Sequence, residues 1–565
     1  MFSCKKKYPR LLEQISAAAR EVWLFEDVTS RRKKASELRA AGQEVTLHSA
    51  YKPLLHTVLE QDLLRGVKEA RIRYPVVAGD EPDRFRLECY PLTALVTTKL
   101  SFSPVPVSAQ EPVFYQIETA ERSFDIRVPV RWQRRLWGQK VLAACALCRE
   151  QDGTEYFLVS EYEQMYADAC RCFWQMPLVP RPGSPPQGPF FDRLQLDITL
   201  PAKDQPLAVE EEHISLSEAL HEDLYFSALE IFAKRLGLEP GSRSLTPGQV
   251  LPKVVYGEAP TLAIHEKEIT AERKGTFSGT PSLSGAGHWL TPGQVENLLA
   301  EVGGRPFSAR SRQGRPIWGR FFPGSNAVAR IALSGGQHAN ESSGVVGALR
   351  AALALREKGD VAFTVCPLGN PDGYAAFREL CEAAPRHMHH AARYTAAGND
   401  LTACTGWEME MRLQARALLP ADLHLNLHGY PAHEWTRPLS GYVPAGFSRW
   451  TIPKGYFVIC RYLKPFQPLA ATLVKEAIAA ISGHEAQLEQ NLRMLRRYRQ
   501  TVGEVDFQVA AEAVPFTFEE VTDALYPIEI ITEAADETVY GESFRIAHQT
   551  HFLVTMALVK CLCEQ

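Results

Sequence analysis

The sequence predicts an α/β fold for the C-terminal part of the chain, preceded by an α+β, β-rich N-terminal region. Three observations lead to this prediction. A stretch rich in Gly, Ser and Thr at 274–287 divides the chain. After it, short apolar strand patterns alternate with helical patterns, which is typical of a layered parallel or mixed sheet. Before it, segments between about 84 and 200 alternate polar with β-branched and aromatic residues, which indicates strands.

In the N-terminal region, 1–273, two segments have apolar spacing near 3.6 and predict helices, at 11–23 and 54–70. The segment 155–166 belongs to the strand-rich part. A Pro-rich stretch at 177–189 predicts a loop, and 215–236 predicts an amphipathic helix. This region, which could comprise two subdomains, carries no recognisable catalytic set, so its function is unknown.

The stretch 274–287 is predicted to be a linker, and 288–565 a catalytic domain. The hexapeptide LTPGQV occurs at 245–250 and again at 290–295; a Thr N-cap followed by Pro predicts a helix start at both places. After the linker the predicted strands are 327–333, 361–365, 423–427 and 527–532, and the predicted helices are 344–358 and 543–563.

Length and composition restrict the class of protein. A chain of 565 residues predicts two or three domains, and a net charge of −4 implies no general attraction to nucleic acid. The 12 cysteines are scattered without a framework, which favours a reducing cytoplasm. The charged N-terminus precedes no apolar stretch, and no apolar run approaches the roughly 18 residues of a membrane span, so we expect a cytoplasmic protein without a membrane partner.

The strongest local motif is SGGQHANE at 334–341, which follows the apolar strand 327–333 directly. His338 and Glu341 stand three residues apart, so one turn of tight backbone can direct both side chains at one point. Zinc accepts imidazole nitrogen and carboxylate oxygen, and a catalytic zinc site needs three protein ligands and a position for water. The motif therefore predicts two ligands of one zinc ion.

His428, in LHLNLHGY, is the predicted third ligand because it closes a strand and is followed by Gly429. His424 is its rival on the same face of the strand, since side chains alternate with period two. If His428 binds the metal, we expect His424 to be a buried, hydrogen-bonded histidine.

SGGQHANE, then NPDGY at 370–374, then LHGY at 427–430 together resemble the carboxypeptidase A-like zinc peptidase family. The resemblance covers roughly residues 290 to 565. It implies an eight-stranded mixed sheet between helices and one zinc ion held by two histidines and one glutamate.

The resemblance also implies roles for other side chains. A glutamate near the C-terminus acts as general base in that family; Glu533, at the end of a strand, fits best, and Glu519 and Glu529 are the alternatives. Arg393 stands where the family has an arginine for the oxyanion. Asp400 matches the aspartate that orients the first zinc histidine.

The sequence departs from the family after Asp400. Thr402-Ala403 replace the Asn-Arg pair that grips a substrate's terminal carboxylate, and Asn340 stands where pancreatic-type members have arginine. The substrate-binding residues are therefore unknown. Candidate replacements are Arg378, Arg386, Arg437, Arg449 and Arg461; candidate catalytic tyrosines are Tyr526 and Tyr540; and candidate polar groups around the site are 386–390 (RHMHH), His433 and Glu434.

The leading hypothesis is a zinc-dependent hydrolase that cleaves an amide bond in a peptide or peptide-like substrate. The missing Asn-Arg pair favours a deacylase or amidase acting on a small acylated amino acid or peptidoglycan fragment. A catalytically inactive binding protein with the same fold is a third hypothesis. The sequence implies no oligomeric state.

Overall fold

The computed structural model describes residues 3–269, 282–432, 438–441, 443, 452–511, 513–535 and 540–565. The chain divides into two compact units. The first comprises Met1–Lys267, His433–Thr451 and Arg499–Gly503, and the second comprises Glu268–Ala432, Ile452–Tyr498 and Glu504–Gln565. The predicted linker, 274–287, lies outside the described residues up to 281.

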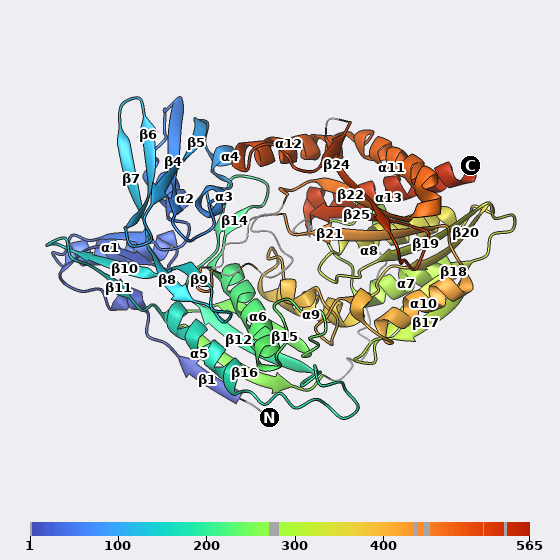
Figure 1. The fold of residues 1–565 in the computed structure, drawn as a ribbon, viewed down its shortest axis with the longest axis horizontal. Helices are drawn as coiled ribbons and strands as arrows, with labels where there is room; N and C mark the ends of the chain where they lie inside the picture. Colours follow the sequence, from blue (N-terminus) through green and yellow to red (C-terminus); the bar gives the residue numbers. More distant parts are fainter. Residues whose placement is uncertain are drawn as a thin grey trace. The chain divides into compact units, whose positions relative to one another are not determined.

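The described part of the first unit is an α+β structure built mainly from three four-stranded sheets (Figure 1). Their strand orders are β1-β16-β12-β15, β11-β10-β2-β3 and β5-β4-β6-β7. The elements are β1 Ser3–Lys7, β2 Ala19–Leu24, α1 Val28–Ala40, β3 Thr46–Ser49, α2 Pro53–Gln61, β4 Glu69–Val77, α3 Arg84–Leu87, α4 Leu92–Leu95, β5 Lys99–Val107, β6 Val113–Thr119, β7 Ser123–Val128, β8 Val130–Arg134, β9 Lys140–Ala144, β10 Ala146–Glu150, β11 Glu155–Leu158, α5 Glu161–Gln175, β12 Arg193–Leu200, β13 Gln205–Pro206, β14 His213–Ile214, α6 Leu216–Arg235, β15 Gln249–Tyr256 and β16 Thr261–Lys267.

The helix predicted at 11–23 is wrong. A short 3-10 turn at Leu11–Glu13 is followed by strand β2, which lies between β10 and β3 in its sheet. Val22, Trp23 and Leu24 are all buried there. Pairing on both edges and burial of both faces outweigh the weak helical preference of the segment.

Of two further predictions for the N-terminal region, one is confirmed and one is only partly right. Helix α6 begins after its N-cap Ser215, whose side chain accepts from the backbone N–H of Glu218, as predicted for 215–236. The segment 155–166 is only partly a strand, because β11 ends at Leu158 and α5 begins after Ser160. A capping box between Ser160 and Glu163 starts that helix.

The two LTPGQV copies have different structures. In the second copy Thr291 caps helix α7, with Pro292 as its first residue, as predicted. The first copy leads into strand β15 instead. There Gly248 has φ +108°, and a Cβ on it would lie 2.2 Å from the carbonyl oxygen of Phe191, so close backbone contact decides the conformation.

The second unit contains a mixed sheet of nine strands within the described residues, in the order β17-β18-β20-β19-β21-β25-β22-β24-β23. The resemblance implied eight; the edge strand β23 has only three residues. The elements are α7 Pro292–Val302, β17 Arg305–Arg310, β18 Pro316–Phe322, β19 Ala329–Gly335, α8 Ser343–Leu355, β20 Val361–Cys366, α9 Pro371–Ala383, α10 Glu408–Leu418, β21 Leu423–Tyr430, β22 Tyr456–Leu463, α11 Gln467–Ser482, α12 Glu485–Thr501, β23 Gln508–Ala510, β24 Val514–Val521, β25 Ile528–Ala535 and α13 Gly541–Cys563.

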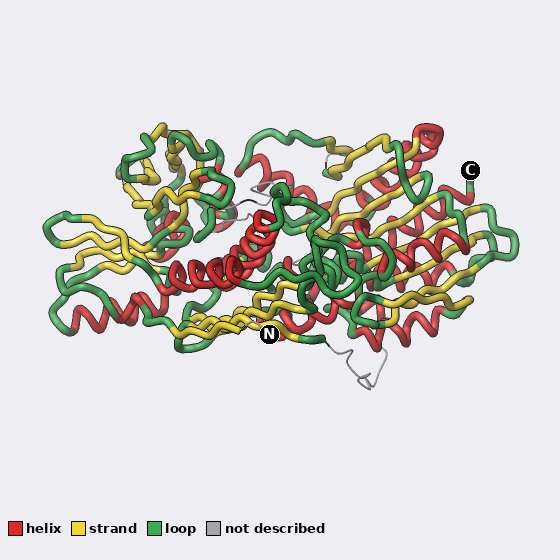
Figure 2. The backbone as a smooth tube through the Cα atoms, turned by 60° about the horizontal axis from the view of Figure 1, so that its bottom comes forward, coloured by secondary structure: helices red, strands yellow, loops and turns green. Residues whose placement is uncertain are grey.

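Helices cover both faces of this sheet, and Figure 2 shows the strands running side by side with helices along them. Helices α8 and α13 pack on the face to which Leu427 points, where Gly347 allows close approach. Helix α10 lies on the other face, where its Met411 packs with Cys366 of β20. The predicted alternation of strands and helices in this half is confirmed.

Helix α13 is long and apolar enough to cross a membrane by length and composition alone. Since 56% of its most apolar window is buried inside the protein, the helix also has the character of a core helix.

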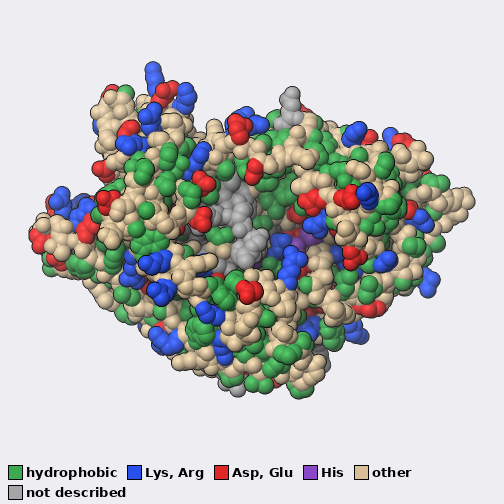
Figure 3. All heavy atoms as spheres, in the orientation of Figure 1, with side chains coloured by type: hydrophobic (Ala, Val, Ile, Leu, Met, Phe, Trp, Pro, Cys, Tyr) green, Lys and Arg blue, Asp and Glu red, His purple; other side chains and the backbone are tan. Residues whose placement is uncertain are grey.

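On the surface of the molecule, Lys and Arg side chains are interspersed with Asp and Glu side chains over the face shown in Figure 3.

Candidate metal centre

The loop between β19 and α8 carries the SGGQHANE motif, and glycines let it approach β21. A Cβ on Gly344 would lie 2.5 Å from the carbonyl oxygen of Leu427, so a larger residue would push α8 away from the strand. Gly336 has φ +60°, a conformation that glycine adopts without strain. The local sequence therefore brings His338 and Glu341 to the end of β21, where His428 lies.

His338, Glu341 and His428 meet at one point. Nδ1 of His338 lies 2.8 Å from Oε1 of Glu341, and Nδ1 of His428 lies 3.0 Å from Oε2 of the same carboxylate. The two Nδ1 atoms are 3.1 Å apart. All three side chains are buried, and their ligand atoms lie within 4.8 Å of one another, so the group could hold a metal ion.

The electrostatics of His428 and Glu341 suit metal ligands, whereas burial would lower the pKa of His338 but the carboxylates of Glu341 and Asp400 outweigh it and raise that pKa. Burial lowers the pKa of His428, although Glu341 opposes this, so the ring is held neutral with a lone pair available. Burial would raise the pKa of Glu341, but His338, Arg393 and His428 outweigh it and lower the pKa. Glu341 is therefore an ionised carboxylate among basic groups.

Asp400 fixes the orientation of His338. Its Oδ2 lies 2.8 Å from Nε2 of His338, the ring nitrogen that faces away from Glu341. Thr402 holds Asp400 in turn, because its backbone N–H and its hydroxyl both donate to Oδ1. A carboxylate at the outer nitrogen sets the tautomer in which Nδ1 presents its lone pair to a metal.

Arg393 is held beside Glu341 by the NPDG motif. Its Nη1 donates to Oε1 of Glu341 at 2.9 Å. Asn370 caps helix α9, so the motif forms the start of a helix, and Nδ2 of Asn370 donates to the carbonyl oxygen of Tyr394. A Cβ on Gly373 would lie 2.7 Å from the carbonyl oxygen of Ala392, which explains the glycine.

Glu533 is the cross-strand neighbour of His428. The two residues are in register on the adjacent parallel strands β25 and β21, so their side chains lie on the same face of the sheet. Glu533 is partly buried, and its Oε2 atom is buried with no hydrogen-bond partner within the described residues. Burial and the charge of Glu341 raise its pKa well above the usual range.

The two alternative candidates for the general base, Glu519 and Glu529, lie further from the two histidines of the metal centre. Glu519 lies on β24, paired with Arg461 and half exposed, and β22 separates that strand from β25. Glu529 lies four residues before Glu533 on β25, further from the strand end, and is held by His424 and Asn426. Of the three glutamates, Glu533 is the one that shares the face and the level of the two histidines.

His424 lies outside the group of three. Its Nδ1 is 3.0 Å from Glu529 and its Nε2 is 2.8 Å from the hydroxyl of Ser334, so it is buried and hydrogen-bonded. Tyr526 packs against its ring, with centroids 5.0 Å apart. Tyr540 is the N-cap of α13, and no hydrogen bond joins either tyrosine to Glu533 among the described residues.

The candidate substrate-binding arginines are reduced in number. Arg437 and Arg449 lie outside the described residues, as do His433 and Glu434. Arg378 stacks on Trp289, and Arg386 is exposed. Arg461 lies on the sheet face of Glu529, 3.9 Å from that carboxylate.

The histidines of the segment 387–390 are buried. Nε2 of His389 lies 2.6 Å from the carbonyl oxygen of Ala384.

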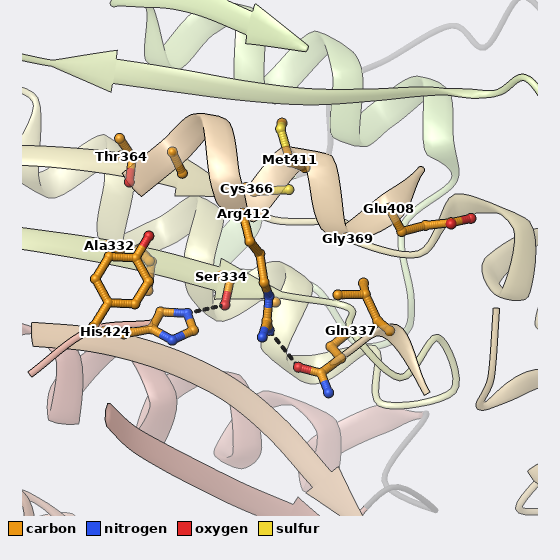
Figure 4. Close-up of a pocket in the computed structure, with 15 residues that line it drawn as sticks. Ala332, Ser334, Gln337, Thr364, Cys366, Gly369, Glu408, Met411, Arg412 and His424 are labelled. Atoms are coloured by element: carbon orange, nitrogen blue, oxygen red, sulfur yellow. Dashed lines mark hydrogen bonds between the residues drawn. The ribbon is translucent and has the colours of Figure 1, made fainter. Parts of the chain in front are cut away.

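A cavity on the α10 face of the sheet was not foreseen (Figure 4). Arg412 reaches into it from α10 and donates to Oε1 of Gln337, the residue before His338. Asn426 of β21 also donates to Gln337, at 3.2 Å. Neither residue was predicted: Asn426 lies between His424 and His428 on the same strand face, a signal that the period of two contained, whereas no local pattern pointed to Arg412.

The second unit is thus an α/β protein with a buried centre of two histidines and one glutamate at the carboxyl ends of its strands. No family model and no curated protein matches the chain.

Solved structures similar to part of the chain include metallopeptidases and carboxypeptidases. A metallopeptidase candidate of Shewanella denitrificans is 15% identical, with 47% of this chain and 88% of that chain covered and a TM-score of 0.31. A metallo-carboxypeptidase of Burkholderia cenocepacia is 14% identical, with 54% and 74% covered and a TM-score of 0.31. One of Pseudomonas aeruginosa is 18% identical, with 48% and 70% covered and a TM-score of 0.27. TM-scores near 0.3 are too low to establish a shared fold, so the function proposed below depends on the geometry of the site.

Proposed function

We propose that this chain is a zinc-dependent hydrolase that cleaves an amide bond in a peptide or peptide-like substrate. The observation that carries the proposal is the meeting of His338 Nδ1, His428 Nδ1 and the Glu341 carboxylate at one buried point. Two imidazoles and one carboxylate form a donor set that suits zinc and leaves a position open for water.

His338, Glu341 and His428 would hold the ion, which supplies activation of a water molecule and polarisation of the substrate carbonyl. Glu533 takes the proton of the attacking water at Oε2 and gives it to the departing nitrogen. Its burial beside Glu341 raises its pKa, which suits a group that must hold a proton between these two transfers. Asp400 keeps the His338 ring oriented throughout.

Arg393 stabilises the oxyanion that develops on the carbonyl oxygen. Burial would lower its pKa, but Glu341 outweighs this and raises it, so the guanidinium stays charged. A fixed cation in a buried site stabilises a developing negative charge far more than it would in water. We assign this role to the guanidinium donors that do not bind Glu341.

A second candidate is a deacylase or amidase that acts on a small acylated amino acid or peptidoglycan fragment. Thr402 favours this candidate. It stands where the family resemblance implies a residue that binds the C-terminal carboxylate of a peptide, and its hydroxyl donates to Asp400 instead. The cytoplasm is the compartment we propose, from the scattered cysteines.

The test is mass-spectrometric profiling of a peptide library and a set of N-acyl amino acids with the zinc-loaded protein. Loss of single residues only from peptides with a free C-terminus supports a carboxypeptidase, and release of acyl groups alone supports the second candidate. Glu533→Gln serves as the inactive control. If the wild type forms no more product than this variant or a blank without protein, the chain is a binding protein and the proposed hydrolysis is wrong.

A further inference from the structure

Two thiols of the first unit come together where strand β1 lies against helix α5. Cys4 lies on β1, the edge strand of the sheet β1-β16-β12-β15, and Cys172 lies near the end of α5. Helix α5 packs on this sheet beside β1 and β16 (Figure 1). Both cysteines are free, and the metal centre of the second unit does not use them.

Two side chains of the N-terminal segment fix the way in which β1 lies on α5. Nζ of Lys6 lies 2.9 Å from Oδ2 of Asp168, and the hydroxyl of Tyr8 donates to the same oxygen at 3.0 Å. Side chains alternate between the two faces of a strand, so Cys4 shares the face of Lys6 and Tyr8. The face of β1 that carries Cys4 is therefore the face that α5 covers.

The same reasoning on the helix brings Cys172 to this contact. It lies four residues after Asp168, on the same side of α5. Four residues of helix rise about 6 Å and two residues of strand rise about 6.6 Å, so one step along each element from the Lys6–Asp168 ion pair leads to the two cysteines. The thiols interact directly: burial, followed by a side-chain interaction with Cys4, raises the pKa of Cys172 to about 12.

The surroundings of the two thiols give them different parts in a reaction. Cys172 is 6% exposed, whereas Cys4 is partly exposed at the edge of the sheet. Burial opposes ionisation of Cys172, while the ammonium of Lys6 favours it. An oxidant from solvent therefore reaches Cys4 first, and Cys172 is the thiol that reacts with the oxidised product.

A third cysteine on α5 is directed elsewhere. Cys170 lies two residues before Cys172, about 200° around the helix. Burial raises its pKa to about 12, and its thiol interacts with Tyr166. The Tyr166 hydroxyl lies 2.9 Å from the hydroxyl of Ser227 on α6, so Cys170 belongs to the side of α5 that faces α6. It serves as an internal comparison for the pair.

We propose that Cys4 and Cys172 are a redox-active pair, and that a hydroperoxide converts the pair to a disulfide that fastens β1 to α5. One oxygen of the hydroperoxide is transferred to the sulfur of Cys4, the O–O bond breaks, and water or an alcohol leaves. The sulfur of Cys172 then attacks the sulfenic acid on Cys4. The S–O bond breaks, the oxygen leaves as water with the proton of Cys172, and the two thiols have supplied the two electrons.

The disulfide would change how firmly the N-terminal strand is held. Among the described strands, β1 pairs with β16 alone, along one edge. A bond to α5 adds a covalent attachment on the face of the strand, so β1 opens less often. In a reducing compartment such a bond is transient, because cellular thiols reverse it.

Peptide mapping by mass spectrometry tests the proposal on the full-length protein. The protein is oxidised with limiting hydrogen peroxide, the remaining thiols are alkylated, and trypsin digests it without a reductant. Cleavage after Lys5 releases a short peptide with Cys4. Cleavage after Arg171 separates Cys172 from Cys170. We expect the peptide that joins Cys4 to Cys172 to exceed every other linked pair by at least about 10-fold, and dithiothreitol to remove it.

Two variants and one further measurement complete the test. Cys172→Ala should abolish the linked peptide, whereas Cys170→Ala, the matched control two residues away, should leave its yield unchanged. The backbone amides of β1 should exchange with solvent at least about 10-fold more slowly in the oxidised than in the reduced wild type. Cys172→Ala should show no such difference. Thermal denaturation establishes that each variant is folded.

Wild-type protein that acquires a sulfinic acid on Cys4 and no linked peptide would overturn the proposal. So would a Cys4–Cys172 peptide that forms to the same extent in urea as in the folded protein, because the fold would then not bring the thiols together. Equal amide exchange of β1 in the two redox forms would also contradict it. None of these measurements requires metal or hydrolysis, so they stand apart from the proposed function.

Discussion

His428 and Glu533 face each other across adjacent parallel strands, in register on β21 and β25. This pairing fixes the separation of a metal-binding imidazole and a carboxylate through the backbone of the sheet. Neither residue depends on a loop for its position. The central chemistry of the second unit is therefore built on its most rigid element.

Glu533→Gln should remove hydrolysis and leave metal binding intact. The amide cannot take a proton from water, and a positioned general base contributes about 10²–10⁴-fold to the rate. We expect kcat to fall by at least about 10³-fold with zinc content unchanged. Glu519→Gln is the control, since that residue is half exposed on β24; if it abolished activity while Glu533→Gln did not, the assigned base would be wrong.

Asp400→Asn should weaken metal binding without unfolding the protein. Loss of the carboxylate at Nε2 of His338 removes the group that sets its tautomer, and such changes cost about 10–100-fold in metal affinity. Competition with a zinc chelator measures the change. Asp422→Asn breaks an exposed ion pair with Arg330 and should leave the affinity unaltered.

Gly344→Ala should separate the two halves of the metal centre. The added Cβ would lie 2.5 Å from the carbonyl oxygen of Leu427, and overpacking of this kind costs about 1–3 kcal/mol. We expect a lower free energy of unfolding in urea together with a weaker zinc affinity. Gly285→Ala is the control because the nearest atom to its added Cβ is 3.9 Å away, and it should change neither quantity.

Glu408 should make stability depend on pH. Burial, with the nearby charge of Asp372, raises the pKa of this carboxyl from 4.5 to about 7. The folded state thus binds the proton more tightly than the unfolded state, so the protonated group favours folding and that contribution is lost as pH rises from 4.5 to 7.

Glu408→Gln mimics the protonated form. It should match the wild type near pH 4.5 and exceed it in free energy of unfolding by on the order of 1–3 kcal/mol above pH 7. Urea denaturation across this range measures the gap. A gap that does not change with pH would refute the assignment; Glu410→Gln, on an exposed position of the same helix, should show no such gap.

The sequence allowed prediction of the parts of the site that local patterns determine. His338, Glu341 and His428 stand at strand ends beside glycines, so strand periodicity and spacing place them without knowledge of the tertiary structure. Asp400 and Arg393 were placed by resemblance, and the structure brings both to the same centre through Thr402 and Asn370.

What could not be predicted depends on tertiary packing. Arg412 lies in the charged pattern of α10, which resembles a solvated helix face, and only the packing of α10 on β20 directs it into a cavity. Residues 11–23 have helical spacing, yet β2 forms because β3 and β10 lie on either side of it. Local preference differs from the observed structure in both cases because long-range contacts are stronger.

Metal analysis by mass spectrometry tests most directly whether His338, Glu341 and His428 hold one zinc ion. Protein purified without added metal and then dialysed against limiting zinc should contain one equivalent per chain. His428→Ala should contain less than about a tenth of that, while His424→Ala, which removes the neighbouring histidine of the same strand, should retain it. Folded wild-type protein that takes up no zinc, or a loss confined to His424→Ala, would contradict the metal centre described here.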